Sequence, residues 1–356
     1  MRITSIETQP LTLELQTPLK VAYGTYPVLE YALLKVFTDE GLLGLGEASP
    51  DPEVTGETQA SVLDALENAS QFLIGKNPFD ISAIINLCSR EIPSYPAAIA
   101  AIDMALYDLI GQKLQVPLYQ LLGGKGRLDI GLYPVIPMDE PSVMAKMSRN
   151  FAEMGIDTLK IKLGSDPKLD LRRLSSIVEA VGNRVKLRLD INQGWKDAET
   201  SLQAIQAMQG YNIEWIEQPV SAGNIDELAK VTAASDIPIM ADESCHNPID
   251  VLKIACHKAA NMINIKLMKC GGIDQAMKML AIAEAAGLPC ILGSMGESSI
   301  GSAAGLHLAI AKPNIIACEL IGPLFINNDP AYGYQIDRIT LRASPSKTPG
   351  LGVKLI

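Results

Sequence analysis

The sequence predicts an α/β protein built as a parallel (β/α) barrel with a smaller α+β domain attached. Eight short apolar β runs alternate with helical stretches and recur at intervals of roughly 25–30 residues, about what a strand, a loop and a crossover helix need. A doubly wound open sheet is the alternative, but no GxGxxG motif follows the first strand of any unit. Eight strands with intervening helices therefore favour the barrel.

The smaller domain is expected over residues 1–124. Residues 1–47 read as β-rich, whereas residues 57–73 and 96–114 carry apolar side chains every three or four positions, as helices do. Gly123 and Gly124 then break the last helix and act as a linker. This third of the chain is therefore predicted to be a separate α+β unit.

The barrel is expected over residues 125–323. Its eight β runs are DIGLYPVI, TLKIKL, VKLRLDIN, IEWIEQP, IPIMADES, MINIKL, PCILGSM and IIACEL. Residues 324–356 contain no further strand–helix unit, so we expect them to return to the first domain.

Composition excludes several classes of protein. The 356 residues are 48% hydrophobic, and the net charge of -10 without any Lys/Arg run argues against nucleic acid as a partner. No apolar run approaches the roughly 20 residues that span a bilayer, so no membrane association is expected. The six cysteines form no CxxC pair, and the first residues alternate like a strand rather than a signal peptide. These features predict a cytoplasmic protein.

Polar side chains gather at the carboxyl ends of five successive β runs, where barrel enzymes form their active sites. They are Lys160, Lys162, Asp190, Asn192, Glu217, Asp242, Glu243, Asn264 and Lys266. Residues two apart on a strand share a face, so the polar residues point one way and their apolar neighbours the other. This reverses the pattern of an ordinary buried strand and predicts a site inside the barrel.

Three of the four acidic residues among these lie on successive strands: Asp190, Glu217 and Asp242. Neighbouring parallel strands lie about 4.8 Å apart, so the three groups can converge, where they would repel and raise one another's pKa values. A divalent cation removes that repulsion, and an all-oxygen set with open positions suits Mg²⁺. Pairing of each carboxylate with a lysine or arginine is the alternative.

Two lysines flank the carboxylates, Lys162 on the strand before them and Lys266 on the strand after them. A lysine on each side of a metal-bound substrate can act as a base on either face, and nearby positive charge lowers its pKa. A metal on the substrate carboxylate would stabilise the negative charge left when the α-proton departs. A small carboxylate is therefore the expected substrate, although a single strand-end lysine is more often a solvated charge.

Several strings resemble the enolase superfamily and its muconate-lactonizing subgroup: LKIKL, RLDINQGW, IEWIEQP, MADES and NIKLMKCGG, with VTGET, LLGGK and the final PGLG. The resemblance covers nearly the whole chain. It implies a modified TIM-type (β/α)7β barrel with an α+β capping domain, and homo-oligomers are common in the subgroup. Other branches use a histidine base on the seventh strand, a place that none of the three histidines here fits.

The resemblance also implies roles for individual residues. Lys162 and Lys266 look like the acid/base pair, and Asp190, Glu217 and Asp242 look like the Mg²⁺ ligands. Lys160 is similar to the accessory lysine that neutralises the substrate carboxylate. Asn192 and Glu243 are expected behind these groups, where they would tune a lysine or a metal ligand.

Substrate specificity is implied for the loops around residues 19–26 and 50–58 and for the ends of strands seven and eight. The expected substrate contacts, besides Lys160, are Lys20, Tyr26, Glu297 and Glu319. Lys20 would pair with a distal carboxylate or remain a solvated loop lysine. Glu297 would touch substrate or orient a lysine, and capping of the following helix is the alternative for this loop.

The resemblance leaves the substrate open, because muconate cycloisomerases, o-succinylbenzoate synthases, N-succinylamino acid racemases and dipeptide epimerases share these motifs. Dipeptide epimerases carry Asp-x-Asp on the eighth strand, where this chain has Glu319 and Ile321. An unpaired ammonium beside Ile321 would be poorly solvated. We favour a racemase or epimerase of N-succinyl amino acids or dipeptides. Cycloisomerase or dehydratase chemistry is the alternative, and a non-enzymatic metal-binding barrel is a remote one.

Overall fold

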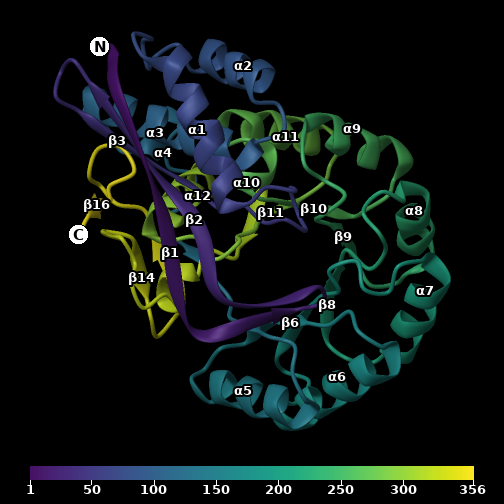
Figure 1. Cartoon of the computed structure of the whole chain (residues 1–356). Coiled ribbons are helices and arrows are strands. Elements are labelled where there is room, and N and C mark those ends of the chain that lie inside the picture. The colour runs from purple at the N-terminus through teal and green to yellow at the C-terminus, as the bar shows by residue number, and fades with distance from the viewer.

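The computed structural model describes residues 1–356, which form a barrel and a capping domain (Figure 1). No helix is both long enough and apolar enough to cross a membrane. In Figure 1 the outer helices surround the barrel strands, and a long hairpin of β1 (Ile3–Val21) and β2 (Gly24–Thr38), drawn in purple, reaches across the barrel. The hairpin belongs to the capping domain, so both domains enclose the space over the barrel.

The capping domain begins with an antiparallel sheet in the order β1-β2-β3 and continues with helices. The further elements are β3 (Leu43–Ala48), α1 (Gln59–Leu73), α2 (Ile81–Glu91), α3 (Pro96–Leu114) and the short α4 (Leu118–Leu121). Helix α1 starts in a capping box. The Thr58 side chain accepts a hydrogen bond from the backbone N–H of Ser61, and the Ser61 hydroxyl accepts one from the N–H of Thr58.

Helix α3 is buried on all sides from Ala97 to Gly111. A Cβ atom at Gly46 of β3 would lie 1.9 Å from the carbonyl oxygen of Ala101, so only glycine permits this close approach. Asp103 accepts a hydrogen bond from the backbone N–H of Ile273, the first residue of a barrel helix. Other residues of α3 belong to the hydrophobic cores of both domains. The helix is therefore the shared wall between cap and barrel.

The second domain is a curled parallel sheet in the order β12-β11-β10-β9-β8-β7-β6-β5. Its strands are β5 (Val135–Ile136), β6 (Thr158–Lys162), β7 (Lys186–Asp190), β8 (Ile213–Glu217), β9 (Ile239–Ala241), β10 (Met262–Ile265), β11 (Cys290–Leu292) and β12 (Ile315–Cys318). The helices between them are α5 (Pro141–Glu153), α6 (Pro167–Val181), α7 (Ala198–Ala207), α8 (Ile225–Ala234), α9 (Pro248–His257), α10 (Leu267–Cys270), α11 (Ile273–Ala285) and α12 (Ser299–Ala311). A parallel bridge between Leu132 and Cys318 joins the two edges. The predicted (β/α)7β barrel is confirmed.

The first barrel strand is shorter than the run DIGLYPVI suggests. This run divides into β4 (Ile130–Gly131) and β5, with Pro134 between them. Proline has no N–H to donate to a strand ladder, and the N–H of Leu132 instead bonds the carbonyl oxygen of Leu341 at 2.7 Å. Strand β4 consequently pairs with β15 (Arg342–Ser344), outside the barrel.

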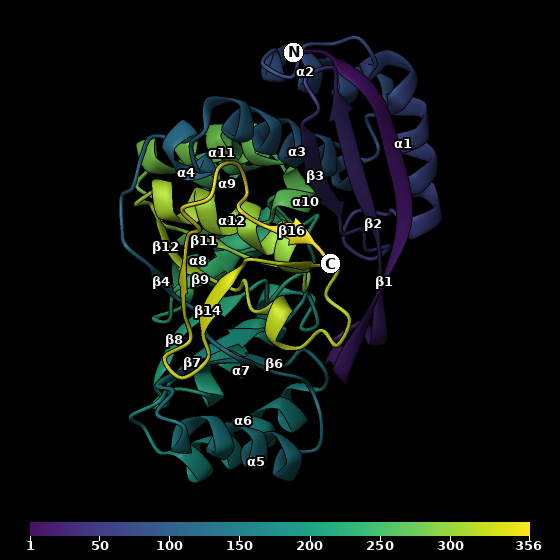
Figure 2. The same cartoon turned by 90° about the vertical axis from the view of Figure 1, so that its left-hand side faces the viewer.

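The C-terminal segment contacts both domains. Its remaining elements are the 3₁₀ helix η1 (Gly322–Leu324), β13 (Ala331–Tyr332), β14 (Gln335–Asp337) and β16 (Lys354–Leu355). Backbone hydrogen bonds of 2.9 Å join Asn327 to Glu14 and Gln16 to Phe325, which fixes the segment to β1. Strands β14 and β15 extend β4 at the side of the barrel (Figure 2). The proposed domain limits at residues 124 and 323 remain predictions.

Candidate active site

The candidate catalytic residues lie at the carboxyl ends of adjacent barrel strands. Lys162 ends β6, Asp190 ends β7 and Glu217 ends β8, and the ladder pairs Lys162 with Asp190 and Asp190 with Glu217. Asp242 follows β9 directly, and Lys266 follows β10. Because these positions are level across the sheet, the structure brings all five side chains together at one end of the barrel.

Strand alternation explains why the polar side chains point inward. Lys160 of β6 is only 2% exposed inside the barrel, whereas Leu159 and Ile161 on either side pack in the hydrophobic core. Ile263 and Ile265 of β10 pack in the same core. The apolar residues thus fill the layer beneath the helices and leave the opposite face to charged groups.

Asp190 is held from two directions. Its Oδ1 accepts a hydrogen bond from the backbone N–H of Asn192 at 3.1 Å, and its Oδ2 lies 2.7 Å from Nζ of Lys162 and 2.9 Å from Nζ of Lys160. Burial disfavours the charged carboxylate, but the two ammonium groups outweigh burial and lower the pKa of Asp190 to about 2. Asp190 is therefore an ionised oxygen donor.

Glu217 shows the same division between its oxygens. Oε1 accepts a hydrogen bond from Nδ2 of Asn264 at 2.8 Å, and Oε2 accepts one from Nζ of Lys160 at 2.8 Å. Burial raises the pKa of Glu217 well above its ordinary value, and the negative charge of Asp190 raises it further. A divalent cation would relieve this repulsion.

Asp242 is bound by two lysines. Its Oδ2 accepts a hydrogen bond from Nζ of Lys266 at 2.8 Å, and its Oδ1 accepts one from Nζ of Lys269. Lys269 lies on α10, is fully buried, and also donates to the backbone oxygens of Asp242 (2.6 Å) and Asn264 (3.1 Å). Lys269 was not predicted from the sequence. Its signal was a second lysine three residues after Lys266, one helical turn further along the chain.

Asp190, Glu217 and Asp242 therefore share one arrangement: one oxygen is held by a neighbouring donor and the other accepts a hydrogen bond from a lysine inside the barrel. In this structure the carboxylate oxygens bond ammonium groups and do not converge on a single point. Three buried carboxylates with one oxygen each turned inward still fit a hard cation that competes with those ammonium groups.

Lys162 and Lys266 both reach a cavity of about 310 Å³ between the capping domain and the barrel. They lie on the second and sixth strands of the eight, so they face one another across the barrel. Burial disfavours the charged form of Lys266, but the neighbouring Asp242 outweighs burial and holds the pKa of Lys266 well above its ordinary value. Any molecule in the cavity has one lysine on each side.

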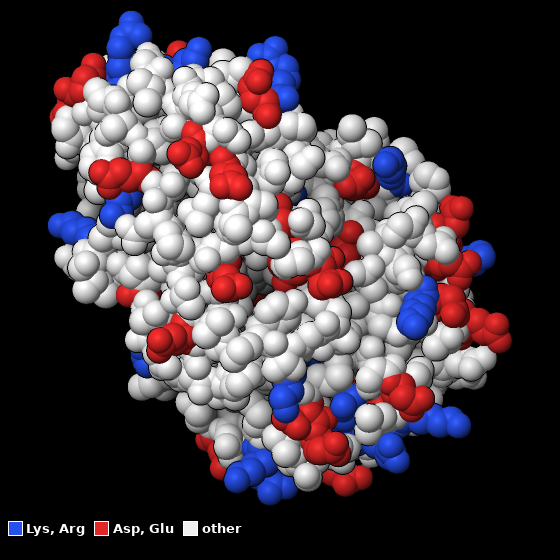
Figure 3. Space-filling model, in the orientation of Figure 1, with Lys and Arg blue, Asp and Glu red and all other residues white.

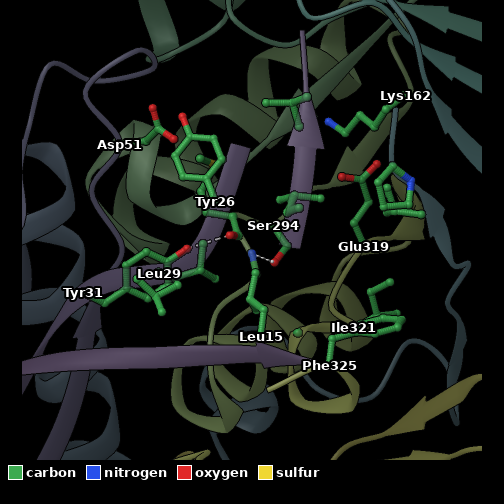
Figure 4. A pocket seen from close by; sticks show the side chains of 18 of the residues that line it. Leu15, Tyr26, Leu29, Tyr31, Asp51, Lys162, Ser294, Glu319, Ile321 and Phe325 are labelled. Carbon is green, nitrogen blue, oxygen red and sulfur yellow. Dashed lines mark hydrogen bonds between the residues drawn. The ribbon is translucent and has the colours of Figure 1, made fainter. Parts of the chain in front are cut away.

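The cavity walls are largely apolar. They include Leu15, Leu19, Val21, Phe151, Ile321 and Phe325. In Figure 4, Asp51 and Tyr26 of the capping domain lie on one side of the cavity, and Lys162 and Glu319 of the barrel lie on the other. On the outer surface, Asp and Glu side chains surround the hollow between the domains (Figure 3).

Glu319 and Tyr26, both expected to contact substrate, line the cavity. Glu319 already accepts hydrogen bonds from Nζ of Lys160 at 2.6 Å and from the hydroxyl of Tyr133 at 3.0 Å. Burial, and then the nearby Asp51 carboxylate, raise the pKa of Tyr26 above its ordinary value. Asp51 was not singled out from the sequence, because nothing in the surrounding loop distinguishes a cavity-facing aspartate from a solvated one.

Lys20 and Glu297, the other expected contacts, lie outside the cavity lining. Lys20 pairs with Asp139 of the barrel at 2.6 Å. The Glu297 carboxylate accepts hydrogen bonds from the hydroxyl of Ser49 (3.3 Å) and from the backbone N–H of Met295 (3.1 Å). This geometry supports an anchoring role for each and gives no support to direct substrate contact.

Asn192, which lines the cavity, and Glu243 form a connected pair beside Lys162. Asn192 accepts a hydrogen bond from Nζ of Lys162 at 3.1 Å and donates one to Glu243 at 3.0 Å. Burial and the nearby charge of Asp242 raise the pKa of Glu243 to about 7. The pair is therefore placed to orient Lys162.

A capped parallel barrel with two lysines facing across three carboxylates defines an acid–base enzyme acting on small molecules. Two family models match the chain: "Enolase C-terminal domain-like" over residues 143–356, and "Mandelate racemase / muconate lactonizing enzyme, N-terminal domain" over residues 3–123. The chain belongs to the mandelate racemase/muconate lactonizing enzyme family of the enolase superfamily.

Relatives of known activity are isomerases. The chain is 41% identical over 363 residues to the hydrophobic dipeptide epimerase of Enterococcus faecalis, with 99% of each protein covered. It is 38% identical over 357 residues to the N-succinyl-L-Arg/Lys racemase of Bacillus cereus, covering 100% of this chain and 96% of the relative.

Solved structures give the same result. The crystal structure of the Bacillus cereus racemase matches with a TM-score of 0.98 at 38% identity, covering 100% of this chain and 96% of the other. The Enterococcus faecalis epimerase, complexed with Mg and the dipeptide L-Leu-L-Tyr, matches with 0.96 at 40% identity, covering 99% and 100%. The predicted family, fold and enzyme class, an isomerase of the racemase and epimerase type, are confirmed.

Proposed function

We propose that this isomerase epimerises dipeptides with apolar side chains, by a Mg²⁺-dependent 1,1-proton transfer between two lysines. The proposal rests on one observation above all: Lys162 and Lys266 face one another across an apolar cavity beside three carboxylates. Two relatives whose structures hold Mg and a dipeptide, from Enterococcus faecalis and Cytophaga hutchinsonii, are 40% and 32% identical to this chain.

Mg²⁺ would be held by Asp190, Glu217 and Asp242, through the oxygens that now accept hydrogen bonds from lysines. When bound, the ion supplies a Lewis acid that stabilises negative charge developing on the substrate carboxylate. Lys160 supplies a further positive charge near that carboxylate and is itself kept in place by Glu319.

The lysines carry the protons. One lysine, in its neutral form, removes the α-proton from one face of the substrate, and the ammonium of the other returns a proton to the opposite face. The reverse reaction exchanges their roles. Asp190 and Asp242 accept hydrogen bonds from the ammonium forms of Lys162 and Lys266. Asn192 accepts a further one from Lys162 and would hold that lysine when Asp190 binds the ion.

Racemisation of N-succinyl amino acids is the second candidate, and it is favoured by the similarity to the Bacillus cereus racemase. A distal succinyl carboxylate, however, would find no cation in the cavity other than Lys160, Lys162 and Lys266. Asp51 lines the cavity and acidic groups surround its entrance (Figure 3), which favours a substrate with an ammonium group.

Cycloisomerase chemistry has weaker support. A chloromuconate cycloisomerase of Pseudomonas putida is 31% identical over 361 residues, below the dipeptide epimerases. A muconate substrate carries two carboxylates, and the apolar cavity provides cations for only one of them, at its lysine end.

The proposal is tested by incubating the enzyme with Mg²⁺ in D₂O and separate pools of apolar L,L-dipeptides and N-succinyl amino acids. Mass spectrometry would detect a one-unit gain at Cα. We expect exchange and epimerisation in the dipeptide pool. Exchange confined to the N-succinyl pool would overturn the substrate assignment, and no exchange in either pool would overturn the reaction.

Alanine variants test the two-lysine mechanism. Lys162→Ala or Lys266→Ala should lower the rate of epimerisation by at least about 10²–10⁴-fold, because each removes one acid/base group. Lys168→Ala changes an exposed lysine on the same domain and should retain the full rate. Epimerisation at the wild-type rate in either catalytic-lysine variant contradicts the mechanism.

A cytoplasmic location and a homo-oligomeric state are part of the proposal. All six cysteines are free thiols and five of them are buried, which fits a reducing compartment.

The relatives bind small molecules, and nothing in the cavity requires a second subunit to complete it. Size-exclusion chromatography with light scattering would test the oligomeric state.

A further inference from the structure

The three carboxylates differ in the donor that holds the oxygen not bonded to Lys160, Lys162 or Lys266. A backbone N–H holds Asp190, and a buried ammonium group holds Asp242. Glu217 alone depends on a neutral side chain, the amide of Asn264, whose Nδ2 donates to Oε1 at 2.8 Å. Both side chains are fully buried, so bulk solvent does not reach this hydrogen bond.

Asn264 makes this bond at a cost. Its Oδ1 is buried and has no hydrogen-bond partner, and an unpaired buried acceptor is unfavourable. Rotating the amide by half a turn would place Oδ1 against the Glu217 carboxylate, where two acceptors repel. A side chain without an amide would avoid the unpaired oxygen altogether. Asn264 therefore supplies a neutral donor to Glu217 even though its own oxygen stays unpaired.

Gly293, at the end of β11, makes room for the amide. A Cβ atom at this position would lie 2.2 Å from Oδ1 and 2.8 Å from Nδ2 of Asn264, so any larger residue would displace the side chain. The backbone N–H of Gly293 bonds Ile265 at 2.8 Å, which keeps β11 level with β10. The amide therefore fits beside Glu217 only because position 293 carries no Cβ atom.

We propose that Asn264, housed by Gly293, is a positioning residue that turns Glu217 so that only Oε2 faces the ion. This inference rests on the proposed Mg²⁺ site and adds to it the residue that fixes the orientation of one ligand. Since Asn264 is neutral, it directs the carboxylate without changing the charge of the site. The expected consequence is a tighter and more selective Mg²⁺ site, because Mg²⁺ tolerates little departure from octahedral geometry.

The test is the affinity of the full chain for Mg²⁺ alone, measured by isothermal titration calorimetry without substrate. Asn264→Leu removes the donor at similar size and equal charge, and should weaken Mg²⁺ binding by about 10- to 100-fold, as for other groups that orient metal ligands. Asn264→Ala is a smaller substitution that keeps the test valid if the leucine does not fit. Gly293→Ala leaves every polar group in place and should weaken binding through the displaced amide.

A matched control separates positioning from general loss of stability. Asn314, just before β12 at the other end of the barrel, donates to the backbone oxygen of Leu288 at 3.1 Å. Asn314→Leu should lower the melting temperature and leave the Mg²⁺ affinity unchanged. Wild-type Mg²⁺ affinity in a folded Asn264→Leu or Asn264→Ala protein would overturn the inference. Failure of the wild-type enzyme to bind Mg²⁺ would instead overturn the proposed function.

Discussion

His307 gives a prediction in which the pH dependence of stability follows from one buried ring. The imidazole lies in α12 and is 1% exposed. Its Nδ1 accepts a hydrogen bond from the backbone N–H of Tyr119 at 3.2 Å, and its Nε2 lies 3.1 Å from the carbonyl oxygen of Leu351. The ring therefore carries its proton on Nε2, and a second proton on Nδ1 would break the bond to Tyr119.

Burial lowers the pKa of His307 to about 4, and the hydrogen bond to Leu351 offsets only part of that effect. In the unfolded chain the pKa is about 6.5. Between these values the unfolded chain binds a proton that the folded chain does not, so stability falls as the pH drops below 6.5. At about 1.4 kcal/mol per pH unit, the loss for His307 amounts to roughly 2 kcal/mol at pH 5.

The assay is urea unfolding of the wild type and His307→Gln at pH 7 and pH 5. A glutamine can accept from Tyr119 and donate to Leu351, but it does not titrate, and the other two histidines are common to both proteins. The wild type should lose about 2 kcal/mol more than the variant between the two pH values. Equal losses in both proteins would show that His307 is not held neutral by the fold.

Three further substitutions test other contacts. Lys20→Ala removes the pair with Asp139 that anchors the tip of the hairpin, and should raise KM by up to about fivefold in steady-state kinetics with little change in kcat. Lys269→Met leaves Asp242 with a single ammonium partner; urea unfolding in EDTA should show a loss of about 3–5 kcal/mol, partly recovered with Mg²⁺. Ile321→Lys places an unpaired ammonium group in the apolar wall, beside the expected position of the dipeptide ammonium, and should lower kcat/KM for apolar dipeptides at least about tenfold. Unchanged values in these assays would contradict the assigned contacts.

The strand-end residues were predictable because they depend on local rules. Period-two alternation places Lys160 and Lys162 on one face of β6, and parallel register brings Lys162, Asp190 and Glu217 level. The barrel itself follows from the regular spacing of its eight units. These features involve neighbouring residues or adjacent strands, so the chain carries enough information about them.

It was not predictable in the same way which side chains of the β1–β2 hairpin face the cavity. The register between β1 and β2 shifts between Glu14 and Leu19, and such an irregularity changes which side chains point to which face. Leu19 and Val21 line the cavity, whereas Lys20 between them turns to Asp139. The sequence shows a lysine in the loop but not the side on which it emerges.

Contacts between distant segments of the chain were also not predictable from the sequence. The Asn264 side chain occupies the space that a Cβ atom at Gly293 would take, so this contact depends on the close packing of two strands. The anchoring of Glu297 by Ser49 crosses from barrel to cap over 248 positions of the chain. No periodicity encodes either contact, because each depends on how complete elements pack.

The burial of α3 on every side limits how this enzyme can acquire new substrates. One domain supplies the chemistry and the other much of the substrate wall, yet they are joined through a helix whose residues belong to both hydrophobic cores. A cap transplanted from a relative would bring a helix surface shaped for a foreign barrel. Productive chimeras should therefore exchange only the hairpin tip and the loop at 50–58, leaving the residues from Ala97 to Gly111 with their own barrel.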